Sequence, residues 1–204
     1  MKITAVVGSY RKGGIVEQTV DELLAAAAAG GAEVRKVWLP DRHLEFCNNC
    51  RSCTQSREGR RGVCPIEDDL AALLDELEAC DAIILASPVN FGTVTAVMKR
   101  FLERFVCYAY WPWGARGPAA RAGRKTASAV LIAAASPPSL LARLFFPVFK
   151  PMQAAADAFG AKVVGTVMVG GASAAPDQRL DAGSAAKARR LGKRLAAGDV
   201  GGKR

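Results

Sequence analysis

The sequence predicts an α/β fold, a doubly wound sheet of five parallel strands with helices on both faces. Two observations support this prediction. Short apolar runs alternate along the chain with longer stretches rich in Ala and Leu, as strands alternate with helices in such folds. Runs such as Ala82 to Ala86 are apolar throughout, which is typical of parallel strands that are buried on both faces.

The elements follow in order along the chain. The predicted strands are Ile3 to Val7, Val34 to Leu39, Ala82 to Ala86, Ala127 to Ala135 and Val163 to Val169. The predicted helices include Val16 to Ala29, Leu70 to Leu77, Val94 to Phe105 and Leu140 to Phe159. Gly30 and Gly160 fall where helices should end, because glycine readily adopts the left-handed conformation that closes a helix. The acidic residues 67–69 place negative charge at the positive end of the next helix.

The chain length and composition indicate one domain. The 204 residues are 50% hydrophobic, which is enough for one substantial core, and no composition break separates two units. We expect a single domain over residues 1–198 and a frayed tail over 199–204. Residues 40–65 form a long, polar, cysteine-bearing insertion, and a loop of that length is usually functional or disordered.

The charge distribution argues against nucleic acid as a partner. The net charge is +9, but many basic residues lie near the C-terminus, where a solvated helix face explains them, and no aromatic recognition motif accompanies them. No apolar run approaches the roughly 18 residues that span a bilayer. We therefore expect a cytoplasmic protein without a membrane span, whose cysteines are free or bind metal. The apolar run from Leu140 to Pro147 favours a homo-oligomer.

Four of the six cysteines lie in the insertion. Cys47, Cys50 and Cys53 are separated by two residues each, and Cys64 precedes a proline. Adjacent thiolates repel one another unless a cation neutralises them, so the clustering predicts a metal or cluster site. Four thiolates satisfy either a [4Fe-4S] cluster or a tetrahedral zinc ion. The sequence leaves three alternatives open: a cluster, zinc, or no metal.

A glycine-rich loop, residues 8–14, joins the first strand to the first helix. Free backbone N–H groups and the helix dipole make such a position an anion site. Ser9 offers a hydroxyl, Arg11 offers a planar set of donors for phosphate oxygens, and Gly14 allows close approach of the backbone. The loop predicts a phosphate site, although the same residues also suit an ordinary tight turn.

A second loop follows the third strand at its carboxyl end. It contains Ser87, Pro88, Asn90, Phe91 and Gly92. Open α/β sheets bind ligands where neighbouring strands diverge at this end, so we expect both loops to border one crevice and these residues to contact the ligand.

With these motifs the chain resembles the NADPH-dependent FMN reductase family of flavodoxin-like proteins, and within it the iron-sulfur flavoprotein branch. The resemblance extends over nearly the whole chain. It rests on the Gly-Ser-x-Arg-Lys-x-Gly loop, on the cysteine segment with Asp68-Asp69 after it, and on Ser-Pro-Val-x-Phe-Gly, with Thr95, Lys99, Phe101 and Arg104 downstream.

The resemblance implies non-covalently bound FMN with NAD(P)H as the co-substrate. It implies that Ser9, Arg11 and Gly14 hold the phosphate and that Pro88, Asn90, Phe91 and Gly92 hold the isoalloxazine ring. Three departures stand out. Ile15-Val16 replaces the usual Asn-Thr after the loop, Asn90 replaces a common Tyr, and residues 54–63 lengthen the gap before the last cysteine. The first two remove a hydroxyl to phosphate and an aromatic contact to the ring.

Three functions compete on this basis. The first is an FMN-dependent oxidoreductase that passes electrons from NAD(P)H or a reduced carrier to a flavin, quinone or similar acceptor, with the cysteine cluster as a relay. The second is a non-enzymatic electron carrier or redox sensor that meets a redox partner protein. The third is a zinc-stapled flavodoxin-like binding module. No nucleophile with its base and no paired carboxylates stand out, so we assign no catalytic side chain.

Overall fold

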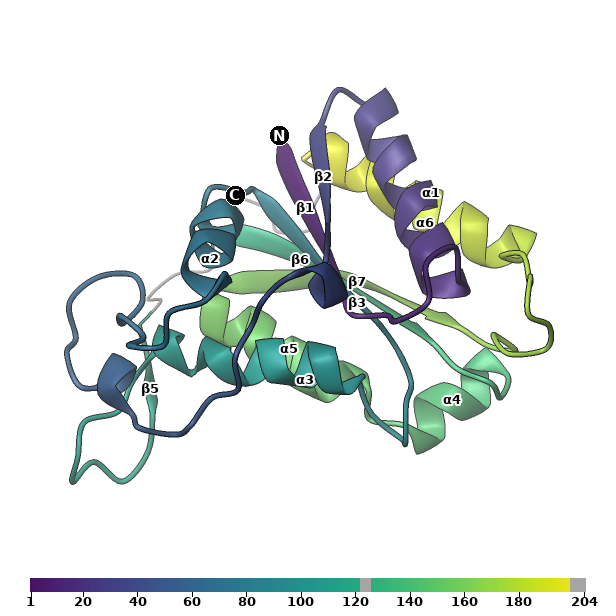
Figure 1. The fold of residues 1–204 in the computed structure, drawn as a ribbon. Coiled ribbons are helices and arrows are strands. Elements are labelled where there is room, and N and C mark those ends of the chain that lie inside the picture. The colour runs from purple at the N-terminus through teal and green to yellow at the C-terminus, as the bar shows by residue number, and fades with distance from the viewer. Residues whose placement is uncertain (122–125, 199–204) are drawn as a thin grey trace.

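Five parallel strands form the central sheet of the computed structural model, which describes residues 1–121 and 126–198 (Figure 1). The strands are β1 (Lys2–Val7), β2 (Glu33–Trp38), β3 (Ala82–Pro88), β6 (Ala127–Ala134) and β7 (Ala161–Val169). Their order in the sheet is β2-β1-β3-β6-β7. This is the flavodoxin-like order, with its switch point between β1 and β3. The predicted fold class is confirmed, whereas the tail 199–204 lies outside the described residues.

Helices cover both faces of the sheet (Figure 1). One face packs against α1 (Ile15–Ala29) and α6 (Ala182–Ala196), and the other against α2 (Leu70–Glu78), α3 (Ala96–Glu103) and α5 (Phe149–Phe159). Alternate residues of β1 therefore enter different cores: Ile3 and Val7 face α1, while Val6 faces the opposite layer. Both faces of the strand are buried, which explains why its sequence is mostly apolar, with Thr4 as a buried polar exception.

The predicted helix from Leu140 to Phe159 is wrong as one element. The structure divides it into α4 (Ser139–Phe145) and α5. Phe146 between them is extended, with φ −112° and ψ 115°. Pro147 explains the break, because a proline disfavours the helical conformation of the residue before it. The predicted ends at Gly30 and Gly160 are confirmed, since these residues close α1 and α5.

The insertion contains little regular structure. Its helical turns are η1 (Leu39–Asp41) and η2 (Ser52–Thr54), and it packs against the turn η3 (Arg104–Tyr108) and a small ribbon of β4 (Ala109–Tyr110) and β5 (Ala119–Ala120). The N–H of Gly62 donates to the carbonyl of Cys107 at 2.8 Å, and the N–H of Trp111 donates to the carbonyl of Thr54 at 2.9 Å. These bonds fix the cysteine segment to η3 and to the residue that follows β4. Among the described residues, no helix is long and apolar enough to cross a membrane.

Candidate functional site

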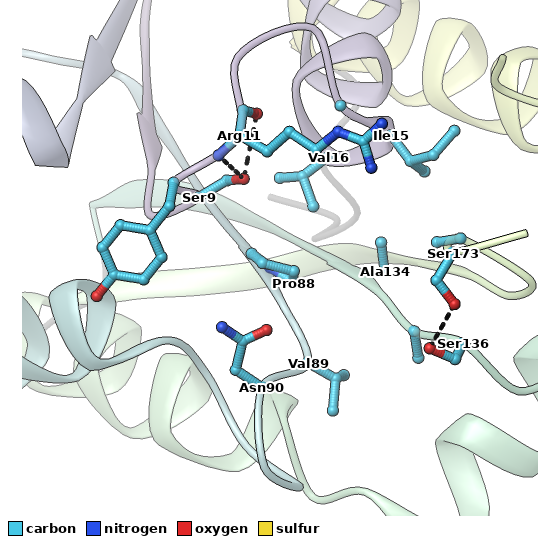
Figure 2. Close-up of a pocket in the computed structure, with 14 residues that line it drawn as sticks. Ser9, Arg11, Ile15, Val16, Pro88, Val89, Asn90, Ala134, Ser136 and Ser173 are labelled. Atoms are coloured by element: carbon cyan, nitrogen blue, oxygen red, sulfur yellow. Dashed lines mark hydrogen bonds between the residues drawn. The ribbon is translucent and has the colours of Figure 1, made fainter. Parts of the chain in front are cut away.

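A cavity of about 270 Å³ opens at the carboxyl ends of β1, β3, β6 and β7; we name it the switch-point cavity. Its lining residues are Ser9, Tyr10, Arg11, Gly14, Ile15, Val16, Pro88, Val89, Asn90, Ala134, Ala135, Ser136, Ala172 and Ser173. Figure 2 shows the first loop on one side, Val89 and Asn90 on another, and a pair of serines on a third. The structure thus brings Ser9, Arg11, Gly14, Pro88 and Asn90 of the predicted site together.

The first loop is held in shape by Ser9. Its buried hydroxyl accepts a hydrogen bond from the N–H of Arg11 at 3.2 Å and lies 3.3 Å from the carbonyl of the same residue (Figure 2). The side chain of Arg11 is exposed and lines the cavity. Ser9 therefore shapes the loop that presents the guanidinium, which remains available to an anion.

Helix α1 begins beside this loop without a side-chain cap. Gly14 is its N-cap residue, and the N–H of Gly13 is already bonded to Glu17 at 2.5 Å. Burial raises the pKa of Glu17, but hydrogen bonds from Lys36 and from this N–H outweigh it and lower the pKa. The uncapped first turn, with Gly14 and the apolar side chains of Ile15 and Val16 in the cavity wall, is a suitable seat for a phosphate.

Thr19 does not replace the hydroxyl that the sequence lacks at the start of α1. Its side chain is fully buried and donates to the carbonyl of Ile15 at 2.7 Å. The donors that this loop offers to an anion are therefore backbone N–H groups and Arg11.

The second loop ends in a tight turn. Asn90 and Thr93 exchange two backbone hydrogen bonds, of 2.8 and 3.2 Å, around Phe91 and Gly92. Both central residues have positive φ, 51° and 84°, as a type I′ turn requires. Phe91 is fully exposed, and neither Phe91 nor Gly92 lines the cavity. These two predicted contacts lie on its rim.

Ser87 also lies outside the cavity lining. Its hydroxyl is buried and accepts a hydrogen bond from the N–H of Thr95 at 3.0 Å. The hydroxyl of Thr95 in turn donates to the carbonyl of Gly8 at 2.6 Å. Ser87 and Thr95 therefore tie the end of β3, the start of α3 and the first loop together, which fixes the two loops relative to each other.

The sequence analysis missed Ser136 and Ser173. They follow β6 and β7, and the hydroxyl of Ser173 donates to that of Ser136 at 2.7 Å (Figure 2). The signal was present, since small polar residues follow the last two apolar runs at the same edge of the sheet.

Phe91 is strained in the turn, which leads to a prediction. A bulky residue in the left-handed region costs about 1–2 kcal/mol, and Asn tolerates it better. We expect Phe91→Asn to raise the free energy of unfolding by about 1 kcal/mol, measured by urea titration of protein without flavin. Phe145→Asn, at an exposed site in α4, is the control and should give no gain. Equal effects of the two changes would contradict the strain argument.

All four predicted metal ligands meet in a second cavity, of about 260 Å³, which we name the four-cysteine cavity. Cys47, Cys50, Cys53 and Cys64 line it together with Asn48, Asn49, Arg51, Ile66, Arg104, Val106 and Trp111. The two cavities share no lining residue. Figure 1 shows the segment 47–64 near β5, well away from the start of α1.

The thiols surround the cavity and do not converge on one point. Among the described residues, no three His, Cys, Asp or Glu side chains are arranged to hold a single metal ion. Burial, and then the charges of Cys64, Cys47 and Cys50, raise the pKa of Cys53 to about 11. Hydrogen bonds from Ser52 lower the pKa of Cys50. Thiolates at all four positions therefore need a compensating positive group within the cavity.

Arg104 contributes such a group. Its side chain is 2% exposed and pairs at 2.7 Å with Asp68, which is 1% exposed. Its second nitrogen donates to the sulfur of Cys64 at 3.4 Å. Burial raises the pKa of Asp68, but hydrogen bonds from Arg104 and from two backbone N–H groups outweigh this effect, so the pKa is lower than usual. Asp68 thus has a second role besides placing negative charge at the start of α2, because it holds Arg104 against Cys64.

Comparisons with known proteins identify the family of the chain. The sequence model of the family described as NADPH-dependent FMN reductase matches residues 1–137. An iron-sulfur flavoprotein of Archaeoglobus fulgidus is 36% identical over 112 residues, which are 55% of this chain and 49% of that protein. An iron-sulfur flavoprotein of Methanocaldococcus jannaschii is 38% identical over 104 residues, 51% of each chain. The matched part of this chain thus spans about half the length of these curated relatives.

Solved structures share the fold. The NAD(P)H:quinone oxidoreductase from Methanothermobacter marburgensis superposes with a TM-score of 0.69 at 14% identity, covering 96% of this chain and 98% of that one. An azoreductase from Bacillus anthracis superposes with a TM-score of 0.64 at 17% identity, covering 98% of both chains. These structures show the fold, and the match of the family's sequence model over residues 1–137 shows that the chain belongs to the NADPH-dependent FMN reductase family.

Proposed function

We propose that the protein is an FMN-dependent oxidoreductase that transfers electrons from NAD(P)H or a reduced carrier to a flavin, quinone or similar acceptor. The observation that carries this proposal is the switch-point cavity, where an uncapped helix start, Arg11 and the loop after β3 line one space. Bound FMN would supply the redox chemistry, and the protein would supply binding, orientation and exclusion of water.

The two sides of the cavity suit the two ends of FMN. Arg11, Gly14 and the first N–H groups of α1 would hold the phosphate, with Ser9 fixing the loop. Pro88 and Asn90 would hold the ring from the second loop. Phe91 and Gly92 would reach only the outer edge of the ring, and Ser87 would act through the position of the loop.

We propose further that the four cysteines bind a [4Fe-4S] cluster. Each cysteine of such a cluster ligates a different iron, whereas zinc requires all four sulfurs about 2.3 Å from one ion. Thiols distributed around one cavity fit the first arrangement better. The relatives are named iron-sulfur flavoproteins, which supports the same assignment.

One spectrum tests both assignments. Protein purified without oxygen and incubated with FMN is examined by ultraviolet-visible absorption, and iron and zinc are measured on the same sample. Flavin bands with broad iron-sulfur absorption and stoichiometric iron would support both proposals. A protein that takes up no FMN would overturn the oxidoreductase proposal, and stoichiometric zinc would overturn the cluster.

Arg11→Ala tests the phosphate site. We expect FMN binding to weaken by about 1–3 kcal/mol, the range for a hydrogen bond to a charged group, measured by titration of flavin fluorescence. Lys12→Ala is the matched control, because Lys12 carries the same charge next in sequence but pairs with Asp41 and does not line the cavity. Equal affinities of wild-type protein and Arg11→Ala would refute this role.

Further proposals concern the assembly, the compartment and the partners of the protein. Leu140, Leu144 and Phe145 of α4 are largely exposed, which favours a homo-oligomer. All six cysteines are free, as expected in a reducing compartment such as the cytoplasm. We propose small-molecule electron donors and acceptors, with a redox partner protein as the alternative donor.

A further inference from the structure

Two guanidinium groups, one from the partly buried Arg51 and one from the buried Arg104, form part of the wall of the four-cysteine cavity. Arg51 and Arg104 both line it. The Nε atom of each is buried, and neither has a hydrogen-bond partner within residues 1–121 and 126–198. Buried donors without a partner are rare in folded proteins. Two of them on one cavity indicate that the group bound there accepts hydrogen bonds.

Arg104 is fixed by three acceptors. One nitrogen donates to Asp68 at 2.7 Å and to the carbonyl of Glu45 at 2.8 Å, and the other donates to the sulfur of Cys64. Asp68 neutralises its charge, so Arg104 acts on the cavity mainly through directed N–H groups.

Arg51 is held differently. Its guanidinium lies between two indole rings, 4.0 Å from the centre of Trp111 and 4.2 Å from that of Trp113. One nitrogen donates to the carbonyl of Trp111 at 2.6 Å. Among the described residues, no carboxylate forms a salt bridge with Arg51, so no neighbouring anion neutralises its charge.

We propose that Arg51 and Arg104 donate hydrogen bonds to the sulfurs of the bound cluster and thereby raise its reduction potential. The inference rests on the cluster assignment above. Adding one electron makes a cluster with four thiolates more negative. Positive charge and N–H donors stabilise that reduced state more than the oxidised state. Arg51 contributes a full positive charge, and Arg104 contributes a bond directed at a ligand sulfur.

The test compares reduction potentials. Wild-type protein, R51Q, R51K and R104K are reconstituted with iron and sulfide without oxygen, and each is titrated with dithionite while the reduced cluster is followed by electron paramagnetic resonance. R57Q is the matched control, because Arg57 lies in the same segment and over the ring of Tyr110 but does not line the cavity.

We expect R51Q to shift the one-electron equilibrium about tenfold toward the oxidised cluster, a potential about 59 mV more negative. R104K should shift it in the same direction, and R51K and R57Q should stay near wild type. Wild-type potentials in R51Q and R104K would overturn this inference alone. Failure of the wild-type protein to retain iron would overturn the cluster proposal and this inference with it.

Discussion

Replacing Arg104 by leucine is expected to lower the free energy of unfolding by about 3–5 kcal/mol, the loss that follows when one partner of a buried ion pair is removed. The side chains of Arg104 and Asp68 are both almost completely buried, and a 2.7 Å salt bridge pairs their charges. Leucine would leave the carboxylate of Asp68 buried without a counter-ion. Urea unfolding at pH 7, followed by circular dichroism, measures the loss.

The double variant R104L/D68N is the control. Asparagine carries no charge and keeps one acceptor oxygen, so it can accept from only one of the N–H groups of Glu45 and Leu70, which bond to different oxygens of Asp68. We expect it to recover a large part of the stability, because replacing both charges of a buried pair is far less damaging than removing one. A double variant as unstable as R104L would show that lost packing, not the stranded carboxylate, causes the effect.

The single variant R104L should also respond to pH in a defined direction. The pKa of Asp68 is lowered in the folded wild-type protein, so the stability that Asp68 contributes is present above its unfolded value, near 3.8, and is lost as pH falls through the folded pKa. Without Arg104, one of the groups that lower the pKa is lost, so the pKa of folded Asp68 is higher in the variant than in wild type. The stability difference between the two proteins should therefore shrink as pH falls from the folded pKa of Asp68 in the variant to that in wild type. A constant difference from pH 7 to pH 3.5 would contradict the assignment.

The sheet was predictable because burial on both faces leaves a clear trace in the sequence. Most positions of a strand such as β3 are apolar when helices cover both sides, and the continuous apolar run Ala82 to Ala86 therefore indicates such a strand. The break before Pro147 was missed because the apolar side chains continue across it, and hydrophobicity alone does not report the backbone conformation of Phe146.

The candidate sites were predictable only in part. The spacing of the cysteines was enough to predict that they meet, since three of them lie within one short loop. The direction of a side chain at the end of a strand was not predictable: Ser87 lies in the predicted loop but turns into the core toward Thr95. Arg51 and Arg104 are distant in sequence, and only the tertiary fold brings them to one cavity.

Gly62→Ala is expected to disrupt the cysteine segment. Gly62 lies between the third and fourth cysteines, and a methyl group there would overlap the carbonyl oxygen of Cys53 and lie 2.6 Å from its carbonyl carbon. Both contacts are with backbone, and the N–H of Gly62 is held by the carbonyl of Cys107, so neither side has room to move. The backbone at position 62 and the backbone of Cys53 must then move apart, close to the point where Cys53 and Cys64 line the same cavity.

The expected result is a loss of about 3 kcal/mol in the free energy of unfolding, at the upper end of the range for overpacking, together with loss of bound iron after reconstitution. Gly59→Ala is the matched control, because it strains the same loop through a φ of 77° but makes no contact with Cys53. It should cost about 1 kcal/mol and retain iron. Wild-type iron content in Gly62→Ala would show that the four cysteines bind their metal without the close approach of Gly62 to Cys53.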